Sequence, residues 1–454
     1  MSNKILLIGI DGIDPSILEH YRDELPTFKR LVVNGTFGKL HSTIPSVSGP
    51  AWTSMMSGKN PGKTGIIDFI GRDPLSENKG RIFNSLSVKT LRIWNEVEKS
   101  GGKSVVIGVP ITFPVKKIEG VMIGGFMTSS LDSKRAFYPS SLKKKLKDKD
   151  YTFFIDISSF EKQKDEELLD LLYKSAKNKF SIINDYLKKN DWNFFTFVIS
   201  ETDWIQHFFE YKPNSKNIGK IIEFYKFIDK KLEKVIENNR DTNILITSDH
   251  GFGKQGKYHV YLNYWLKKEG LLKERSKNRK GKSFLAENFR RILAIPGMKL
   301  IKNFIPENLK KRAIKSEELD KADIELDKTI AYFFSSFQNT GFINIRNVDK
   351  IKNKRKLKKN IADRLISLTD SKGNKIIKEV YLDEEIYAGP YIKNCPDIAL
   401  IFEKEYTGKD IIGKNLVRKI PKGGRPKPGH RMDGVLIGYG PDIKKRGKFE
   451  CFYT

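Results

Sequence analysis

The chain has 454 residues, of which 39% are hydrophobic and 11% aromatic. This composition excludes an intrinsically disordered polypeptide, and the length favours more than one domain. Lysine and arginine (84) outnumber the acidic residues (55), which gives a formal net charge of +29 at pH 7. Such an excess favours anionic partners, such as phosphorylated substrates, acidic lipids or nucleic acids, although a lysine-rich solvated surface would explain it equally well.

The sequence shows no feature of export or membrane insertion. It enters an apolar segment at residues 4–10 without the basic and long apolar regions of a signal peptide. No apolar run is long enough to span a bilayer, and two cysteines, Cys395 and Cys451, provide no disulfide framework. We therefore predict a cytoplasmic protein.

Strand-like and helix-like segments alternate through the first half of the chain. Helical spacing of apolar residues and short apolar runs are both clear signals of secondary structure. Strands are predicted at 4–10, 104–109, 121–126, 194–200 and 243–247, and helices at 166–189 and 218–238. This alternation predicts an α/β fold with a mostly parallel central sheet sandwiched by helices.

The character of the sequence changes after about residue 262. Residues 267–315 are rich in lysine, arginine and asparagine, and strands or hairpins at 329–345 and 375–387 flank a helix near 350–369. Short apolar runs that are typical of buried strands then return at 397–402 and 435–439. We predict a catalytic core formed by 1–262 and 395–454, interrupted late by a basic α+β cap insertion at 263–394.

A segment of the predicted cap, residues 289–305, mixes apolar residues with cations. It could make peripheral contact with an anionic membrane, pack as ordinary amphipathic helices, or gate a substrate. The Pro296-Gly297 pair breaks the segment into short pieces, which favours ordinary packing. No nucleic-acid-binding module is recognisable, so specific nucleic-acid recognition is not expected.

Acids and histidines follow three of the predicted strands. Asp11 follows 4–10, Asp203 and His207 follow 194–200, and Asp249 and His250 follow 243–247. Open α/β sheets place ligands and chemistry at the carboxyl ends of their strands. Carboxylate and imidazole together suit a borderline divalent metal such as Zn²⁺ or Mn²⁺, so the pattern indicates a metallohydrolase.

Ser48 is the candidate nucleophile. It stands before Gly49-Pro50 at the predicted start of a helix, where free backbone N–H groups can bind an anion and a metal can activate the hydroxyl. Alternatively, Ser48 only caps the helix, and the nearby hydroxyls Ser42, Thr43 and Ser46 compete for the role.

The ordered motifs resemble those of the alkaline phosphatase superfamily, in particular the type I phosphodiesterase/nucleotide pyrophosphatase family. The resemblance extends over nearly the whole chain and implies an alkaline-phosphatase-like core. Its motifs are Asp11-Gly12, Ser48-Gly49-Pro50-Ala51-Trp52, Asn60-Pro61-Gly62-Lys63, Asp203 with His207, Ser248-Asp249-His250-Gly251 and Gly429-His430.

The resemblance implies two divalent metal ions, most readily zinc, with manganese or iron as alternatives. Its pattern gives one metal to Asp203, His207 and His430. It gives the other to Asp11, Asp249, His250 and the Ser48 oxygen. The Ser48 oxygen would attack phosphorus to form a covalent phospho-seryl intermediate, which water would then hydrolyse.

Three positions depart from relatives. Ala51 stands where nucleotide pyrophosphatases carry an asparagine that binds a phosphate oxygen, and Ser48 replaces their threonine. Trp52 occupies the position at which sulfatases require arginine, which argues against a sulfatase. We therefore expect a small anionic phosphoester substrate, whether nucleotide, sugar-linked or lipid-linked.

The predicted activity is metal-dependent cleavage of phosphodiester or pyrophosphate bonds. A phosphomonoesterase, phosphonate hydrolase or phosphotransferase of the same superfamily is the first alternative. The second is a non-catalytic basic protein that binds acidic lipids or polymers; the competent residue at every implied ligand position argues against it. The sequence predicts no oligomeric state.

Overall fold

The computed structural model describes residues 4–71, 80–155, 165–209, 216–254, 256–275, 324–335, 339–346, 349, 351–420, 428–444 and 448–452. The chain divides into two compact units. The core unit comprises Met1–Asn60, Phe83–Lys254 and His430–Thr454, and the second unit comprises Pro61–Ile82 and Gln255–Gly429.

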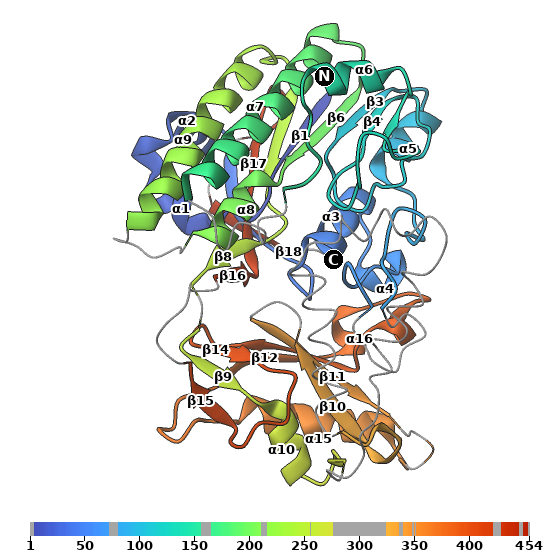
Figure 1. Cartoon of the computed structure of the whole chain (residues 1–454), viewed down its shortest axis with the longest axis vertical. Helices are drawn as coiled ribbons and strands as arrows, with labels where there is room; N and C mark the ends of the chain where they lie inside the picture. Colours follow the sequence, from blue (N-terminus) through green and yellow to red (C-terminus); the bar gives the residue numbers. More distant parts are fainter. Residues whose placement is uncertain are drawn as a thin grey trace. The chain divides into compact units, whose positions relative to one another are not determined.

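A nine-stranded sheet forms the centre of the core unit (Figure 1). β17 is antiparallel to both of its neighbours and β5 is antiparallel to β4, whereas all other neighbouring pairs are parallel. The order across the sheet is β18 (Lys448–Phe452), β2 (Thr36–His41), β17 (Asp433–Tyr439), β7 (Asn243–Thr247), β1 (Ile5–Ile10), β6 (Phe194–Ile199), β3 (Ser104–Ile107), β4 (Gly120–Ile123) and β5 (Phe137–Tyr138).

Helices cover both faces of this sheet. Side chains alternate along β1, so that Leu6 and Ile8 join one buried cluster and Leu7 joins the other. The first cluster includes α7 (Asp165–Lys189) and α9 (Lys216–Glu237). The second includes α3 (Ser48–Ser57) and α5 (Ile93–Lys99). The predicted mostly parallel sheet sandwiched by helices is therefore confirmed.

The helix α7 shows how the sequence dictates this layer. Leu168, Leu172, Ala176, Phe180 and Ile183 recur three to four residues apart and are all buried. The first turn is acidic and the last turn is basic, which complements the helix dipole at both ends. Burial of this apolar stripe fixes α7 against the sheet.

The second unit contains two smaller sheets. One has the order β10 (Ala331–Ser335), β11 (Thr340–Ile345), β13 (Ile398–Phe402) and β12 (Ile377–Leu382), and all its pairs are antiparallel. The helix α15 (Lys354–Ile366) packs on β12. The other has the order β14 (Tyr406–Gly408), β9 (Tyr258–Val260) and β15 (Val417–Lys419). An α+β unit inserted late in the chain was predicted from the sequence.

The boundaries of the second unit differ from those predicted for the cap. Residues 395–429 belong to it rather than to the core, because β13 pairs with β11 and β12. Residues 61–82 and 255–262 also belong to it. The sequence of a short buried strand such as β13 is compatible with either sheet, since its apolar run does not specify the partner strands.

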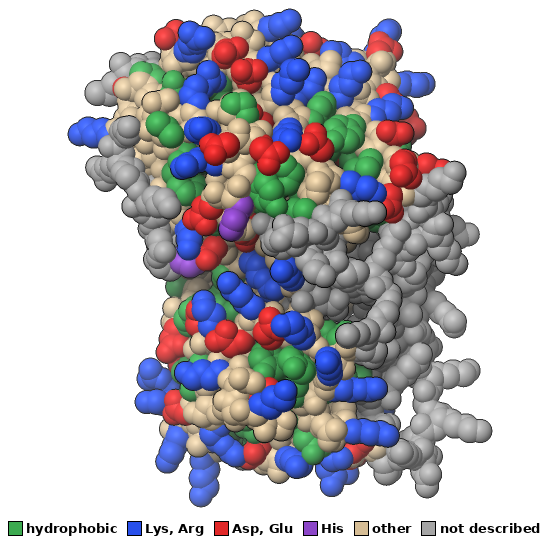
Figure 2. All heavy atoms as spheres, turned by 90° about the vertical axis from the view of Figure 1, so that its left-hand side faces the viewer, with side chains coloured by type: hydrophobic (Ala, Val, Ile, Leu, Met, Phe, Trp, Pro, Cys, Tyr) green, Lys and Arg blue, Asp and Glu red, His purple; other side chains and the backbone are tan. Residues whose placement is uncertain are grey.

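No helix among the described residues is long and apolar enough to cross a membrane. On the face drawn in Figure 2, lysine and arginine side chains are spread among acidic ones rather than gathered in one patch. The cationic segment 289–305 lies outside the described residues. A cytoplasmic location and contact with an anionic membrane stay predictions.

Candidate functional site

The site lies at the carboxyl ends of three adjacent strands. β1 pairs in parallel with β6 on one side and β7 on the other, with Ile10 opposite Ile199 and Gly9 opposite Thr247. The three strands therefore end level with one another. The segments that follow them carry all the predicted acids and two of the three predicted histidines.

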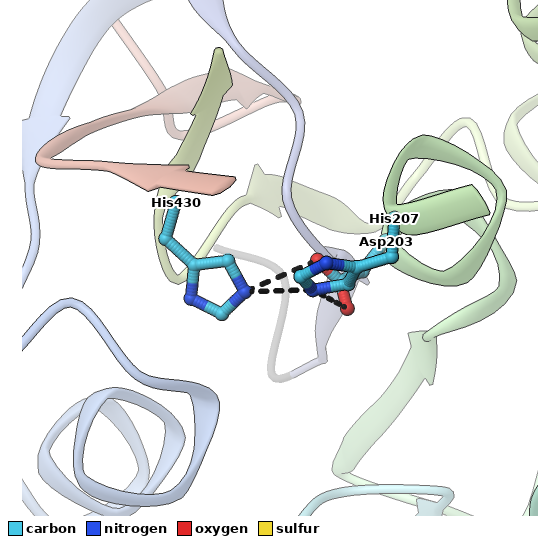
Figure 3. Close-up of side chains that lie close together, drawn as sticks. All are labelled: Asp203, His207 and His430. Atoms are coloured by element: carbon cyan, nitrogen blue, oxygen red, sulfur yellow. Dashed lines mark hydrogen bonds and ion pairs between the residues drawn. The ribbon is translucent and has the colours of Figure 1, made fainter. Parts of the chain in front are cut away.

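Asp203, His207 and His430 form the first group of ligand-type side chains (Figure 3). Asp203 and His207 lie one turn apart on α8 (Glu201–Phe208), and His430 lies on β16 (Gly429–Arg431). The Nε2 atoms of His207 and His430 are 3.0 Å apart. Asp203 Oδ2 lies 3.3 Å from His207 Nε2, and Asp203 Oδ1 lies 3.5 Å from His430 Nε2.

Asp11, Asp249 and His250 surround the Ser48 hydroxyl in a second group. Ser48 Oγ lies 3.4 Å from Asp11 Oδ1 and 3.3 Å from His250 Nε2. His250 Nε2 lies 3.3 Å from Asp249 Oδ2 and 3.6 Å from Asp11 Oδ1. The ring of His250 also stacks on that of His430, with centroids 3.6 Å apart. The structure thus brings all seven predicted site residues together.

Ser48 is the first residue of α3, and the extended residue Val47 precedes it as the N-cap without a side-chain capping bond. Its hydroxyl is therefore engaged by the acid and the histidine described above rather than by a capping bond. Of the competing hydroxyls, Ser42 donates to the Asp249 carbonyl and Thr43 to the Pro45 carbonyl. In the described part of the chain, Ser48 is the one of these four hydroxyls that contacts side chains of the predicted ligands.

Burial and like charges shift the pKa values of the carboxyl groups. Burial, followed by Asp249 and Asp203, raises the pKa of Asp11 well above its ordinary value. Burial and Asp203 raise the pKa of Asp249 to about 7. Burial would also raise the pKa of Asp203, but its histidine neighbours outweigh burial and hold the value low. Ionising all three carboxyl groups together is therefore costly, because they are buried and their negative charges lie close to one another.

Two of the site histidines, His430 and His250, hold their Nδ1 atoms against backbone carbonyls. Nδ1 of His430 lies 2.7 Å from the Ser46 carbonyl, and Nδ1 of His250 lies 3.0 Å from the Gly251 carbonyl. A proton on each Nδ1 leaves the Nε2 lone pair directed at the carboxylates, which is the usual arrangement of metal-binding histidines. Burial, followed by His250, also lowers the pKa of His430 well below its ordinary value, which favours the neutral ring.

Two buried carboxylate oxygens, Asp203 Oδ1 and Asp249 Oδ2, accept no hydrogen bond from any residue that the structure describes. Only histidine nitrogens lie within ion-pair distance of Asp11, Asp203 and Asp249 in the described part of the chain. Unpaired acceptors are costly to bury. Together with the imidazole nitrogens, they form a donor set that fits borderline divalent cations, and Asp203 of the first group also lies close to Asp11 and His250 of the second.

Sequence reasoning did not find the residues that support these groups. Trp52 is fully buried and donates its indole N–H to Asp11 Oδ2 at 3.1 Å. Asp249 Oδ1 accepts from the Gly12 backbone at 3.3 Å. Trp52 lies four residues after Ser48, so both belong to the same face of α3, and this spacing is the signal that could have identified it.

The comparisons with known proteins agree with this architecture. The sequence model of the family described as type I phosphodiesterase / nucleotide pyrophosphatase matches residues 5–415. No curated protein sequence matches the chain significantly.

Among solved structures, phosphonoacetate hydrolase from Sinorhizobium meliloti 1021, in complex with phosphonoacetate, is similar with a TM-score of 0.61 and 13% identity, over 97% of this chain and 91% of that one. Human ectonucleotide pyrophosphatase/phosphodiesterase 5 is similar with a TM-score of 0.54 and 13% identity, over 99% and 91%. An inactive variant of the murine protein in complex with AMP has a TM-score of 0.54 and 14% identity, over 99% and 91%. At these identities the likeness concerns the fold. The match to the family model covers most of the chain. The chain therefore belongs to the type I phosphodiesterase / nucleotide pyrophosphatase family, a family of phosphoric ester hydrolases.

Proposed function

We propose that this protein cleaves phosphodiester or pyrophosphate bonds with two divalent cations and a covalent phospho-seryl intermediate. The observation that carries the proposal is the position of Ser48 Oγ, 3.4 Å from Asp11 Oδ1 and 3.3 Å from His250 Nε2 at the start of α3. A hydroxyl held among acids and imidazoles at a helix N-terminus is suited to attack an anionic phosphoryl group.

Asp203, His207 and His430 would hold one cation, and Asp11, Asp249, His250 and the Ser48 oxygen would hold the other. Bound divalent cations offset the charge of a phosphoryl group and lower the pKa of a nearby hydroxyl. The mixture of imidazole and carboxylate favours zinc, and manganese and iron also suit it. The unpaired oxygens of Asp203 and Asp249 support this assignment.

The side chains of the core unit would perform the bond changes as follows. The Ser48 hydroxyl would lose its proton to the departing oxygen, a bond would form between Oγ and phosphorus, and the bond from phosphorus to that oxygen would break, so that the leaving group departs as an alcohol or a phosphate ester; Asp11 Oδ1, 3.4 Å from Oγ, would help to hold the hydroxyl in place. Backbone N–H groups at the start of α3 stabilise the negative charge of the phosphoryl oxygens. Water then cleaves the Ser48 ester, which returns the hydroxyl and releases phosphate or a phosphomonoester.

The substrate is proposed as a small anionic phosphoester, whether nucleotide, sugar-linked or lipid-linked. The similar solved structures contain phosphonoacetate in one case and AMP in another. Ala51 lies buried on α3 and cannot donate a hydrogen bond from its side chain to a phosphate oxygen. This favours a substrate whose recognition does not depend on that contact.

Hydrolysis of bis-p-nitrophenyl phosphate and p-nitrophenyl phosphate tests the proposal. Metal-stripped protein is supplied with Zn²⁺, Mn²⁺ or Mg²⁺, with Ser48→Ala measured in parallel. We expect faster cleavage of the diester, restoration by a metal, and loss of turnover in the variant. Preferred cleavage of the monoester would move the activity to a phosphatase. Equal turnover by Ser48→Ala would exclude the covalent route, and no turnover with any metal would favour a binding protein.

A further inference from the structure

Two side chains of α8 that are not candidate ligands connect it to the turn after β1. Thr202 immediately precedes Asp203, and Gln206 immediately precedes His207. Both Thr202 and Gln206 are fully buried. Because they lie four residues apart, they project from one face of the helix, beside the face that carries the candidate ligands.

Each of these side chains bonds to the segment that carries Asp11. Thr202 Oγ1 donates to the Asp11 carbonyl at 2.7 Å, and it lies at the same distance from the Ile199 carbonyl. Gln206 Nε2 donates to the Gly12 carbonyl at 2.9 Å. Two successive carbonyls after β1 are thus held by two successive turns of α8. The Thr202 and Gln206 hydrogen bonds therefore connect α8 to the turn after β1 at two points.

The packing at Gly12 makes this connection rigid. Gly12 has a φ of +70°, and a Cβ added there would lie 3.1 Å from Asp203 Oδ1 and 3.3 Å from Asp203 Cβ. A glycine is therefore required both by the backbone conformation and by the close approach of Asp203. The turn after β1 therefore packs closely against Asp203 of α8.

The position of these links matters because Asp203 belongs to both groups of candidate ligands. One group consists of Asp203, His207 and His430, and the other contains Asp11 and His250 with Asp203. A displacement of α8 relative to the Asp11 segment would change the spacing of both groups together. Residues that orient metal ligands in this manner commonly alter metal affinity by about 10- to 100-fold when they are replaced.

We propose that Thr202 and Gln206 are positioning residues that couple two cation sites, so that a cation bound at one site preorganises the other. This rests on the proposed function, because it requires two bound cations. Asp203 and His207 of α8 would be held in place by a bound cation, and the Thr202 and Gln206 hydrogen bonds would transmit that order to the Asp11 segment. The second cation then binds more tightly than it would to an uncoupled site.

The test is a Mn²⁺ titration of the metal-stripped full-length protein. Calorimetry gives the number of ions and their stepwise affinities, and electron paramagnetic resonance detects a spin-coupled Mn²⁺ pair. Thr202→Val removes the hydroxyl but keeps the branched shape, whereas Thr202→Ser keeps the hydroxyl. Thr196→Val is the matched control, because Thr196 is also fully buried in β6 and its hydroxyl has no hydrogen-bond partner.

We expect Thr202→Val to weaken binding of the second ion by about tenfold and to diminish the spin-coupled signal. Thr202→Ser and Thr196→Val should retain both properties. Gln206→Met, which keeps the chain length but removes the amide, should resemble Thr202→Val. It provides a second variant if Thr202→Val does not fold, as judged by circular dichroism.

Two outcomes would overturn the coupling while leaving the proposed function intact. In one, the wild-type protein binds two ions and both the Thr202→Val and Gln206→Met titrations superimpose on it. In the other, Thr202→Ser loses as much affinity as Thr202→Val, which would show that packing rather than the hydroxyl matters. A wild-type protein that binds fewer than two ions would refute the two-cation function and the coupling together.

Discussion

The two units of the molecule differ in how their acidic side chains are paired. In the core unit, Asp11, Asp203 and Asp249 lie together, and their ion-pair partners among the described residues are histidines alone. In the second unit, Asp383 and Glu384 both contact Lys358, which α15 supplies. One group of acids is neutralised within the chain, and the other is not.

The core unit also contains a buried acid that is paired with a buried lysine. Behind the site, Glu201 is fully buried, and its two oxygens accept from Ser175 at 2.7 Å and from Lys179 at 2.8 Å. Glu201 lies only two residues from Asp203 on the same helix. This difference supports the proposed cation sites, because a buried acid without a counter-charge is costly.

The largest expected effect comes from Asp203, which is a candidate ligand of one cation and lies close to Asp11 and His250 of the other group. Asp203→Asn removes this charge, so we expect the loss of at least one bound ion. We also expect a kcat/KM lowered on the order of 1,000-fold, which corresponds to about 4 kcal/mol. Metal content and hydrolysis rates measure this. Asp191→Asn, at an exposed carboxylate paired with Lys103, is the matched control. Full occupancy by two ions in Asp203→Asn would contradict this prediction.

Removal of metal should destabilise the core unit. Each ion at a free concentration 100-fold above its Kd stabilises the folded state by about 3 kcal/mol, because it binds the folded chain and not the unfolded one. Metal-stripped protein should therefore unfold at a lower temperature, and added Zn²⁺ or Mn²⁺ should reverse the change. Scanning calorimetry at several metal concentrations measures it. A midpoint that does not depend on metal would contradict the assignment of external cations.

The stability of the second unit should depend on Lys358 rather than on a bound metal ion. Lys358→Met leaves Asp383 and Glu384 without their shared cation. We expect a loss of about 2 kcal/mol in the free energy of unfolding, less than for a fully buried pair because Glu384 is 35% exposed. Urea unfolding measures the loss, and added metal should not restore it. Lys356→Met, at an exposed position of the same helix, is the control; an equal loss there would contradict the prediction.

The smallest effect concerns pH. Burial, followed by Lys409 and Arg418, lowers the pKa of His259 to about 4 from 6.5. The folded state then keeps a neutral ring while the unfolded chain binds a proton, so stability is lost as the pH falls from 6.5 to 4. His259 is half-buried, and solvent screening limits the effect to at most about 1 kcal/mol.

His259→Gln should therefore reduce the loss of stability in this pH range. Urea unfolding of metal-stripped wild type and variant at pH 7 and pH 4.5 isolates the contribution, because both proteins share the titration of the site. The prediction would be wrong if the variant and the wild type lost the same free energy of unfolding between the two pH values.

Local pattern alone predicted the three strands that carry the site and the positions that end them. β1, β6 and β7 are short apolar runs, and each is followed at once by an acid or by a short polar segment that contains one. Parallel pairing then brings those ends level, so the convergence of Asp11, Asp203 and Asp249 follows from the sequence and the fold class together. The resemblance to a family supplied His430, which is distant along the chain.

Only the tertiary structure decided the partners across the chain. The apolar run of β13 is compatible with either sheet, and pairing with β11 and β12 places it in the second unit. Thr202 looks like an ordinary helix residue, yet its hydroxyl reaches the Asp11 carbonyl, 191 positions away. Periodicity determines which residues form strands and helices, because it reflects local backbone geometry. Hydrogen-bond partners are chosen by packing between distant segments, which no local pattern encodes.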